Sequence, residues 1–213
     1  MPHRLLPQEN VEEGEEVVVV HFLRRASPKI CYSLRTPLYG VFAMAFDKKS
    51  PNVAFIDGQN LHLGTREKGW SVNHGRLRTY LRDKYGVGEA YYFLGYVSEG
   101  EQDLYDKLQK AGFILSFREH SVALKGKKKG NVDCDIIFSV MRKLVDDEPF
   151  EKIYIVSGDG DYKKMVDFLI KKGKFGKMLF PNLEFASSLY KKMGSDYFAN
   201  LGDAGVKAKI QHL

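Results

Sequence analysis

The amino-acid sequence predicts an α/β protein, a three-layer α/β/α sandwich whose central sheet is mostly parallel. Short apolar runs rich in β-branched and aromatic residues alternate with segments of helical periodicity, and strands separated by helices form parallel sheets. One such run ends abruptly in Ser157-Gly158-Asp159-Gly160-Asp161, and a helical pattern follows. A buried parallel strand, a tight turn and a helix give this pattern, and ligands bind at the carboxyl ends of such strands.

The composition excludes several classes of protein. With 213 residues, the chain can form one domain with a substantial core. Two cysteines, Cys31 and Cys134, are too few for a disulfide framework, so we expect a reducing, cytoplasmic setting. No apolar run approaches the roughly 18 residues of a membrane span. The first apolar run follows glutamates rather than lysines, so neither a secretory signal nor a membrane partner is expected.

Residues 1–43 differ from the rest of the chain. Five glutamates precede Val17-Val18-Val19-Val20, arginines and prolines follow, and no helical face is evident. Acids and bases balance in this segment, so the net charge of +6 lies in residues 44–213. Met44 precedes a stretch that is typical of a chain start before a strand. We therefore expect a folded domain of residues 44–213, preceded by an extension that is either non-native, with Met44 as the true initiator, or poorly ordered.

The domain begins with an apolar strand at residues 53–56, which ends in Asp57-Gly58-Gln59-Asn60. The spacing of Leu77, Tyr80 and Leu81 predicts a helix from about 72 to 84. A second strand is expected at residues 90–97 and a third at 113–117. Between them, leucines spaced four residues apart predict a helix that opens near Glu101.

The second half of the domain continues the alternation. A basic loop at residues 125–131 precedes a predicted helix at 132–145, and the strand at 153–156 precedes a helix that opens near Tyr162. A fifth strand is expected at residues 177–180 and a last edge strand at 197–199. The spacing of Phe185, Leu189 and Tyr190 predicts one further helix between these two strands.

Aspartates lie at the ends of these elements that meet at one edge of the sheet. Asp57 ends the first strand and Asp159 follows the fourth, and both strands are apolar up to the acid. Asp133 lies one turn before Ile137, on the expected core face of the helix at 132–145. Asp135 lies about 200° from Asp133 on an ideal helix, so it should point outward unless the first turn is irregular. We therefore rank Asp133 first and Asp135 second as a metal ligand.

Carboxylates that converge in this way repel one another unless a cation lies between them or one is protonated. A hard divalent cation such as Mg²⁺ takes oxygen ligands and leaves room for water and substrate phosphate. We expect Asp57, Asp133, Asp159 and Asp161 to hold one or two such ions, which would activate water against a phosphodiester. Asn60 either orients a carboxylate or a water, or caps a helix. The cysteines and histidines lack the spacing of a zinc site.

Simpler interpretations exist for each motif. Aspartate and glycine are favoured in turns and helix caps, so any one of these acids alone fits that role. A dinucleotide-binding loop does not fit, because Lys163 stands where its third glycine belongs. A calcium loop does not fit either, because Lys164 stands at the position of its turn glycine.

Lysines form a second candidate group. Lys125, Lys127, Lys128 and Lys129 directly precede the helix that carries Asp133. Lysine runs usually form solvated loops, but an acidic pocket bordered by lysines also suits a polyanion whose backbone is the substrate. We therefore assign these four lysines to contacts with the backbone of RNA.

Three motifs resemble those of the NYN domain family, in its LabA-like branch, which belongs to the PIN-like nucleases. They are Phe55-Ile56-Asp57-Gly58-Gln59-Asn60, Lys129-Gly130-Asn131-Val132-Asp133 and Val156-Ser157-Gly158-Asp159-Gly160-Asp161-Tyr162. The similarity runs from about residue 52 to 198. It implies a PIN-like, Rossmannoid fold, dependence on Mg²⁺ or Mn²⁺, and cleavage of RNA. The positions that match the family's active site are Asp57, Asn60, Asp133, Asp159 and Asp161, and Asp135 falls where related sequences can carry an acid.

The sequence thus predicts a metal-dependent endoribonuclease that acts on single-stranded RNA with water as the nucleophile. Ser157 and Asn60 would position ligands, and a homodimer is also considered. The main alternative is a non-catalytic module that binds RNA or protein and retains the acidic pocket. A phosphatase is the third candidate, but it lacks the Asp-x-Asp pair after the first strand because residue 59 is Gln59.

Overall fold

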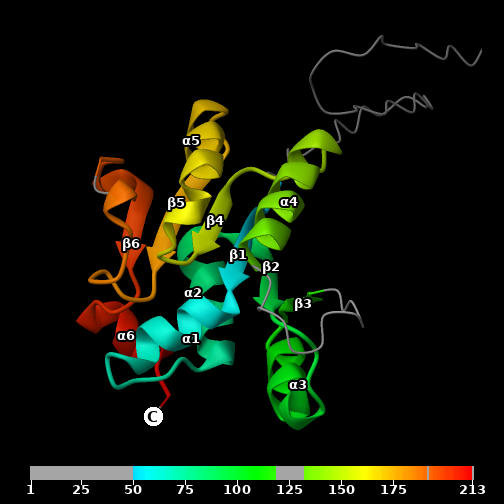
Figure 1. The fold of residues 1–213 in the computed structure, drawn as a ribbon, viewed down its shortest axis with the longest axis vertical. Coiled ribbons are helices and arrows are strands. Elements are labelled where there is room, and N and C mark those ends of the chain that lie inside the picture. The colour runs from blue at the N-terminus through cyan, green and yellow to red at the C-terminus, as the bar shows by residue number, and fades with distance from the viewer. Residues whose placement is uncertain (1–49, 119–131, 191, 213) are drawn as a thin grey trace, which may run out of the picture. The chain divides into compact units, whose positions relative to one another are not determined.

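The computed structural model describes residues 50–118, 132–190 and 192–212. In these residues a single sheet alternates with helices along the chain (Figure 1). The strands are β1 (Asn52–Asp57), β2 (Val87–Leu94), β3 (Ile114–Phe117), β4 (Ile153–Val156), β5 (Phe175–Phe180) and β6 (Phe198–Asn200). The α-helices are α1 (Gly58–Arg66), α2 (His74–Tyr85), α3 (Gln102–Lys110), α4 (Val132–Val145), α5 (Lys163–Lys171) and α6 (Ala204–Ile210). Short 3₁₀ helices are η1 (Glu99–Glu101), η3 (Gly160–Tyr162), η4 (Ser188–Tyr190) and η5 (Ser195–Tyr197).

The sheet has the order β3-β2-β1-β4-β5-β6, and every neighbouring pair of strands is parallel. In the central register, Ala54 of β1 lies opposite Ala90 of β2 and Tyr154 of β4. From β1 the chain builds outward in one direction through β2 and β3. It then returns to the other side of β1 with β4. The carboxyl ends of β1 and β4 therefore lie where the strand order reverses, which is the place where ligands bind in sheets of this kind.

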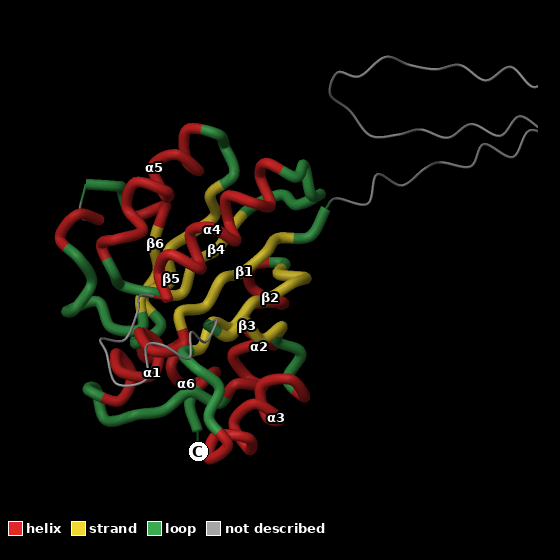
Figure 2. The backbone as a smooth tube through the Cα atoms, turned by 45° about the vertical axis from the view of Figure 1, so that its right-hand side comes forward, coloured by secondary structure: helices red, strands yellow, loops and turns green. Residues whose placement is uncertain are grey.

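Helices cover both faces of the sheet (Figure 2). The alternation of side chains along β1 sends Val53 and Phe55 into one apolar core and Ala54 and Ile56 into the other. The first core is closed by α4 and α5, and the second by α1, α2, α3 and α6. The predicted three-layer α/β/α architecture with a parallel sheet is thereby confirmed.

Most predicted elements are present, and α4 has the predicted bounds. The second strand is three residues earlier than expected, because β2 begins at Val87 and ends at Leu94. Two helices, α1 and α6, were not predicted. The helix expected around residues 185–190 is wrong, since the chain forms only η4 there. Of the three side chains meant to form its core face, Tyr190 is buried but Phe185 and Leu189 are exposed, so no apolar face supports a longer helix.

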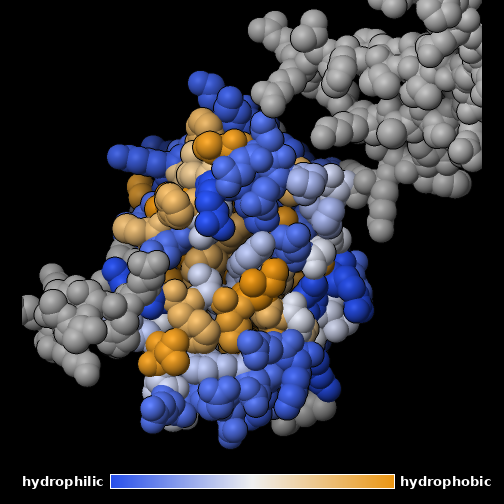
Figure 3. Space-filling model, turned by 90° about the vertical axis from the view of Figure 1, so that its right-hand side faces the viewer, coloured by the Kyte–Doolittle hydropathy of each residue, from blue (hydrophilic) through white to orange (hydrophobic). Residues whose placement is uncertain are grey.

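One outer face of the molecule carries α4 and the β3 edge of the sheet, and apolar residues gather there between hydrophilic ones (Figure 3). Phe138 and Val145 of α4 and Ile114 of β3 are exposed. A single chain does not test the homodimer, which stays a prediction. In the described ranges, no helix combines the length and the apolar character needed to cross a bilayer. Residues 1–43 lie outside these ranges, so the domain boundary at residue 44 also stays a prediction.

Candidate active site

The predicted acids lie at the carboxyl edge of the two central strands. Asp57 is the last residue of β1, and Asp159 and Asp161 follow the end of β4. Asp133 lies in the first turn of α4, on the face that also buries Ile136. Because β1 and β4 are neighbours at the point where the strand order reverses, these elements bring their polar ends together.

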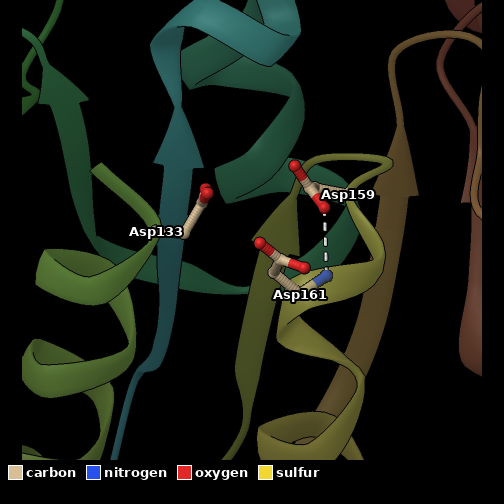
Figure 4. Close-up of side chains that lie close together, drawn as sticks. All are labelled: Asp133, Asp159 and Asp161. Carbon is tan, nitrogen blue, oxygen red and sulfur yellow. Dashed lines mark hydrogen bonds between the residues drawn. The ribbon is translucent and has the colours of Figure 1, made fainter. Parts of the chain in front are cut away.

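Three carboxylates form a cluster. Asp133, Asp159 and Asp161 each present an oxygen atom, and these atoms all lie within 4.8 Å of one another. Asp133 approaches from α4, and the other two come from the turn after β4 (Figure 4). The cluster is graded in burial, because Asp133 is 7% exposed, Asp159 is partly buried and Asp161 is exposed. It is therefore closed on the side of α4 and open to solvent at Asp161.

The turn that carries Asp159 and Asp161 is held by its own polar groups. The backbone N–H of Asp161 donates to Asp159 Oδ1 over 3.0 Å, so Asp159 caps η3. The N–H of Asp159 donates to Ser157 Oγ over 3.2 Å, and the Tyr190 hydroxyl donates to the Asp159 carbonyl. Gly160 favours close packing between the two acids, because a Cβ there would lie 2.6 Å from Ser187 Oγ, which would have to move. These contacts fix the backbone of the turn and the direction of the Asp159 carboxylate.

Asp57 lies behind the cluster and is not one of its three mutually close carboxylates. Asp57 Oδ1 caps α1 by accepting the N–H of Asn60 over 2.9 Å. Its Oδ2 lies 3.4 Å from Ser157 Oγ and 3.3 Å from the Tyr162 hydroxyl. Burial raises the pKa of Asp57, and the negative charge of Asp133 adds to this effect. Both carboxylate oxygens of Asp57 thus have hydrogen-bonding neighbours within the protein.

Tyr162 connects Asp57 to the cluster. Its hydroxyl donates to Asp133 and also lies within hydrogen-bonding distance of Asp57 Oδ2. Burial, followed by the charges of Asp57 and Asp133, raises the pKa of Tyr162 well above its ordinary value, so the phenol keeps its proton. A phenol has one proton to donate, and both carboxylates compete for it. Tyr162 therefore orients Asp133 and links it to Asp57.

Asn60 and Ser157 join the two central strands across the site. Asn60 Oδ1 accepts the N–H of Gly158 over 2.9 Å, which ties α1 to the turn after β4. The cap of α1 is Asp57, so the capping alternative for Asn60 is wrong. Ser157 is fully buried and contacts both Asp57 and the backbone of Asp159. Both residues position the acids.

The remaining predicted site residues have different outcomes. Asp135 is partly buried, and its Oδ2 atom is buried without a hydrogen-bond partner in the described part of the chain, so its outward direction stays a prediction. Lys125, Lys127, Lys128 and Lys129 lie outside the described residues, so their contact with RNA stays a prediction.

Sequence reasoning missed two residues of the site, Tyr162 and Tyr190. Both are among the largest fully buried side chains, and both direct a hydroxyl to the acidic turn or to Asp133. Tyr190 had been placed on the face of a predicted helix and Tyr162 at the start of another, and both rings are buried. The sequence carries no signal for where the hydroxyl points.

The donor set fits a divalent metal ion. It offers carboxylate oxygens only, which are the ligands of Mg²⁺ and Mn²⁺ rather than of soft metals. Three negative groups within 4.8 Å repel one another unless a cation neutralises them. Asp135 lies on the same turn of α4, but it is not one of the three mutually close carboxylates. Within the described ranges, no other three acidic, histidine or cysteine side chains converge in this way.

A parallel sheet that places an acidic cluster at its central crevice is the arrangement expected for a PIN-like domain. The chain belongs to the NYN domain family, whose model matches residues 52–193. It is 25% identical over 138 residues to the low amplitude and bright protein LabA of Synechococcus elongatus, an alignment that covers 61% of this chain and 72% of that one. A crystal structure of a protein of unknown function from Vibrio parahaemolyticus has the same fold. The TM-score is 0.62 at 18% identity, and the match covers 79% of this chain and all of the other.

Proposed function

We propose that this protein is a metal-dependent endoribonuclease that hydrolyses phosphodiester bonds of single-stranded RNA. The observation that carries the proposal is the cluster of Asp133, Asp159 and Asp161 at the central crevice of an NYN domain. Three converging carboxylates would repel a phosphate group, so they do not suit a site that binds phosphate without a cation. They are useful where a cation is placed between them and the substrate.

In this proposal Asp133, Asp159 and Asp161 hold one Mg²⁺ or Mn²⁺ ion, with Asp57 and Asp135 as further candidate ligands. The ion, when bound, neutralises the scissile phosphate and lowers the pKa of a water molecule. The chain itself provides the fixed geometry. Tyr162 holds Asp133 in place, and the exposed side of the cluster at Asp161 leaves a path for the substrate.

The rest of the machinery has a positioning role. Ser157 and Asn60 keep the end of β1 and the turn after β4 at a constant separation, because each contacts both elements. The net charge of +6 favours a polyanionic substrate. Lys125, Lys127, Lys128 and Lys129 are the residues proposed to hold the RNA backbone around the acidic cluster.

Cleavage of an end-labelled single-stranded RNA tests the proposal. Wild type, Asp159→Asn and Asp103→Asn should be compared with Mg²⁺, with Mn²⁺ and with EDTA. Asp103 is an exposed aspartate of α3, a helix on the opposite face of the sheet from α4, so it serves as the matched control. We expect wild type and Asp103→Asn to cleave at similar rates, and Asp159→Asn to lose at least about a hundredfold in rate, as when one essential electrostatic group is removed.

Two results would contradict the proposal. Equal cleavage by wild type and Asp159→Asn would show that the activity comes from a contaminant. Binding of RNA without cleavage by any variant would favour the alternative, a non-catalytic binding module that retains the acids. An endonuclease cuts within the labelled strand and gives fragments of intermediate length on a gel, whereas an exonuclease shortens the strand from one end.

A further inference from the structure

The loop between β5 and η4 lies directly against the acidic turn. The N–H of Ser187 donates to the carbonyl of Gly158 over 2.9 Å. A Cβ on Gly160, the residue between Asp159 and Asp161, would lie 3.2 Å from Leu189 Cδ1. The side chain of Leu189 therefore lies next to the residue that joins two of the three clustered acids.

Four apolar side chains of this loop, of η4 and of α1 are exposed. Leu183 is 47% exposed, Phe185 63% and Leu189 55%, and Leu63 of α1 is 50% exposed. The helix α1 packs on the same loop, since a Cβ on Gly64 would lie 2.9 Å from Cβ of Pro181. We call Leu63, Leu183, Phe185 and Leu189 the apolar shelf.

The exposed side chains of the apolar shelf are not needed to hold the loop. The loop is fixed instead by Tyr190, which is buried, by Asn182 Oδ1, which accepts the N–H of Glu184 over 3.0 Å, and by the ion pair of Lys68 and Glu184. Exposed apolar residues that gather next to a polar site mark a binding surface. Their exposure is therefore best explained by a ligand that covers them.

We propose that the apolar shelf receives an unpaired nucleobase of the RNA whose phosphate lies at the carboxylate cluster. This inference rests on the proposed function and adds to it the way in which the substrate is recognised. A base and its phosphate are joined through one sugar, so a phosphate at the cluster brings its own base to the immediate border of the cluster. The flat face of a base is apolar and stacks on aromatic and aliphatic side chains without regard to sequence.

The position of Leu189 favours a nucleobase over a protein partner. A protein surface that covered Leu189 would also approach Gly160, which lies between Asp159 and the solvent-exposed Asp161, and would obstruct the open side of the cluster. A nucleotide occupies both places at once, with its base on the apolar shelf and its phosphate at the cluster. Bases in a duplex are already stacked and cannot reach the shelf, so the geometry selects single-stranded RNA.

Binding of two oligonucleotides tests the inference. One is a short single-stranded oligoadenylate, and the other has the same length and backbone but abasic sugars. Their affinities for wild type, Phe185→Ala and Phe138→Ala are measured by fluorescence anisotropy with Ca²⁺ as the divalent ion, and a gel checks that the RNA stays intact. Phe138 is the matched control, because it is 65% exposed, close to the 63% of Phe185, and lies on the outer side of α4.

We expect wild type to prefer the oligoadenylate over the abasic strand. Phe185→Ala should weaken oligoadenylate binding by about tenfold, the scale of one lost base stack, and leave the abasic strand unaffected. Phe138→Ala should change neither affinity. In cleavage assays, Phe185→Ala should raise KM far more than it lowers kcat, because the stacked base is held in the ground state and in the transition state alike.

The outcomes separate this inference from the proposed function. If Phe185→Ala binds both strands as wild type does, or weakens both equally, the apolar shelf does not bind a base, while metal-dependent cleavage by wild type would still support the nuclease. If Phe185→Ala leaves RNA binding intact but abolishes self-association in sedimentation, the shelf is a protein interface and the inference is wrong. If wild type neither binds nor cleaves RNA, both proposals fail together.

Discussion

The two ends of helix α4 handle buried charge in opposite ways. Near its last turn, Lys143 is 8% exposed and donates to Glu148 and, over 3.2 Å, to Glu89. Its Nζ also lies 5.2 Å from the centre of the Tyr91 ring. In its first turn, Asp133 is 7% exposed and faces Asp159 and Asp161. Among the described residues, the protein pairs a buried lysine with two glutamates at one end of the helix and brings three carboxylates together at the other.

The pKa values report the same contrast. Burial lowers the pKa of Lys143, but its hydrogen bonds to Glu148, Tyr91 and Glu89 outweigh burial and raise it above the ordinary value. Burial raises the pKa of Asp57 at the acidic end, and there the neighbouring charge of Asp133 raises it further. Folding therefore favours the charged lysine and disfavours the charged aspartate. A structural ion pair and a site prepared for a cation can thus be distinguished by whether the neighbours oppose or support the charge.

The largest expected difference between the two ends is their response to metal. Mn²⁺ that binds only the folded protein should stabilise wild type by about 2.7 kcal/mol at a hundredfold excess over its dissociation constant. Asp133→Asn should lose this stabilisation, because it replaces one of three converging carboxylates with an uncharged amide, whereas Asp103→Asn should keep it. Thermal unfolding with increasing Mn²⁺ measures the effect. An equal shift in wild type and Asp133→Asn would place the metal elsewhere.

At the other end of α4, we expect Lys143→Met to destabilise the protein by about 2 kcal/mol. The loss is smaller than for a fully buried pair, because the side chains of Glu89 and Glu148 are 45% and 39% exposed and water solvates them. Urea denaturation measures it, with the exposed Lys171→Met as a control. RNA cleavage by Lys143→Met should be unaffected below its unfolding temperature, since ten residues of helix place it about 15 Å from Asp133. If Lys143→Met lost RNA cleavage but kept its stability, the proposed separation of roles between the two ends of α4 would be contradicted.

The smallest expected effect concerns Asp57. Its raised pKa means that the folded protein holds this proton more tightly than the unfolded chain, so ionisation of Asp57 costs stability as the pH rises through that pKa. Asp57→Asn keeps the cap of α1, because asparagine caps as well as aspartate. In EDTA at pH 7 it should therefore be more stable than wild type by about 1 kcal/mol, while cleavage is lost. The difference in unfolding free energy between Asp57→Asn and wild type should decrease as the pH falls towards 3.8. A difference that increases would refute the prediction.

The sequence predicted the layers of the fold because the apolar periodicities are strong where both sides of an element are buried. The strand at residues 153–156 is clear for this reason, and helix α4 is clear because one of its faces packs on the core. Helix α1 was not predicted, because its sequence is polar and contains the glycines Gly58 and Gly64. Its stability comes from the Asp57 cap and from the packing of Leu61. The strand order also depends on long-range packing, which local patterns do not encode.

The candidate site was predicted in part. The inward direction of Asp133 followed from helical geometry, and the acids after β4 followed from the end of an apolar strand. The separation of Asp57 from the other three acids could not be predicted, because it depends on the placement of the Tyr162 hydroxyl between two carboxylates. The exposure of Phe185 was missed for a related reason, since an apolar residue at helical spacing is normally part of a core.

The central pairing of β1 with β4 has a consequence for how the protein is made. Ser157 and Asp57 are 100 residues apart in the chain and yet share a hydrogen bond. The carbonyl of Asp159 is held by Tyr190, a further 31 residues along. During synthesis on a ribosome, the amino-terminal half emerges first, and β1 then lacks its neighbour β4. The acidic cluster therefore takes shape only after most of the chain has been synthesised.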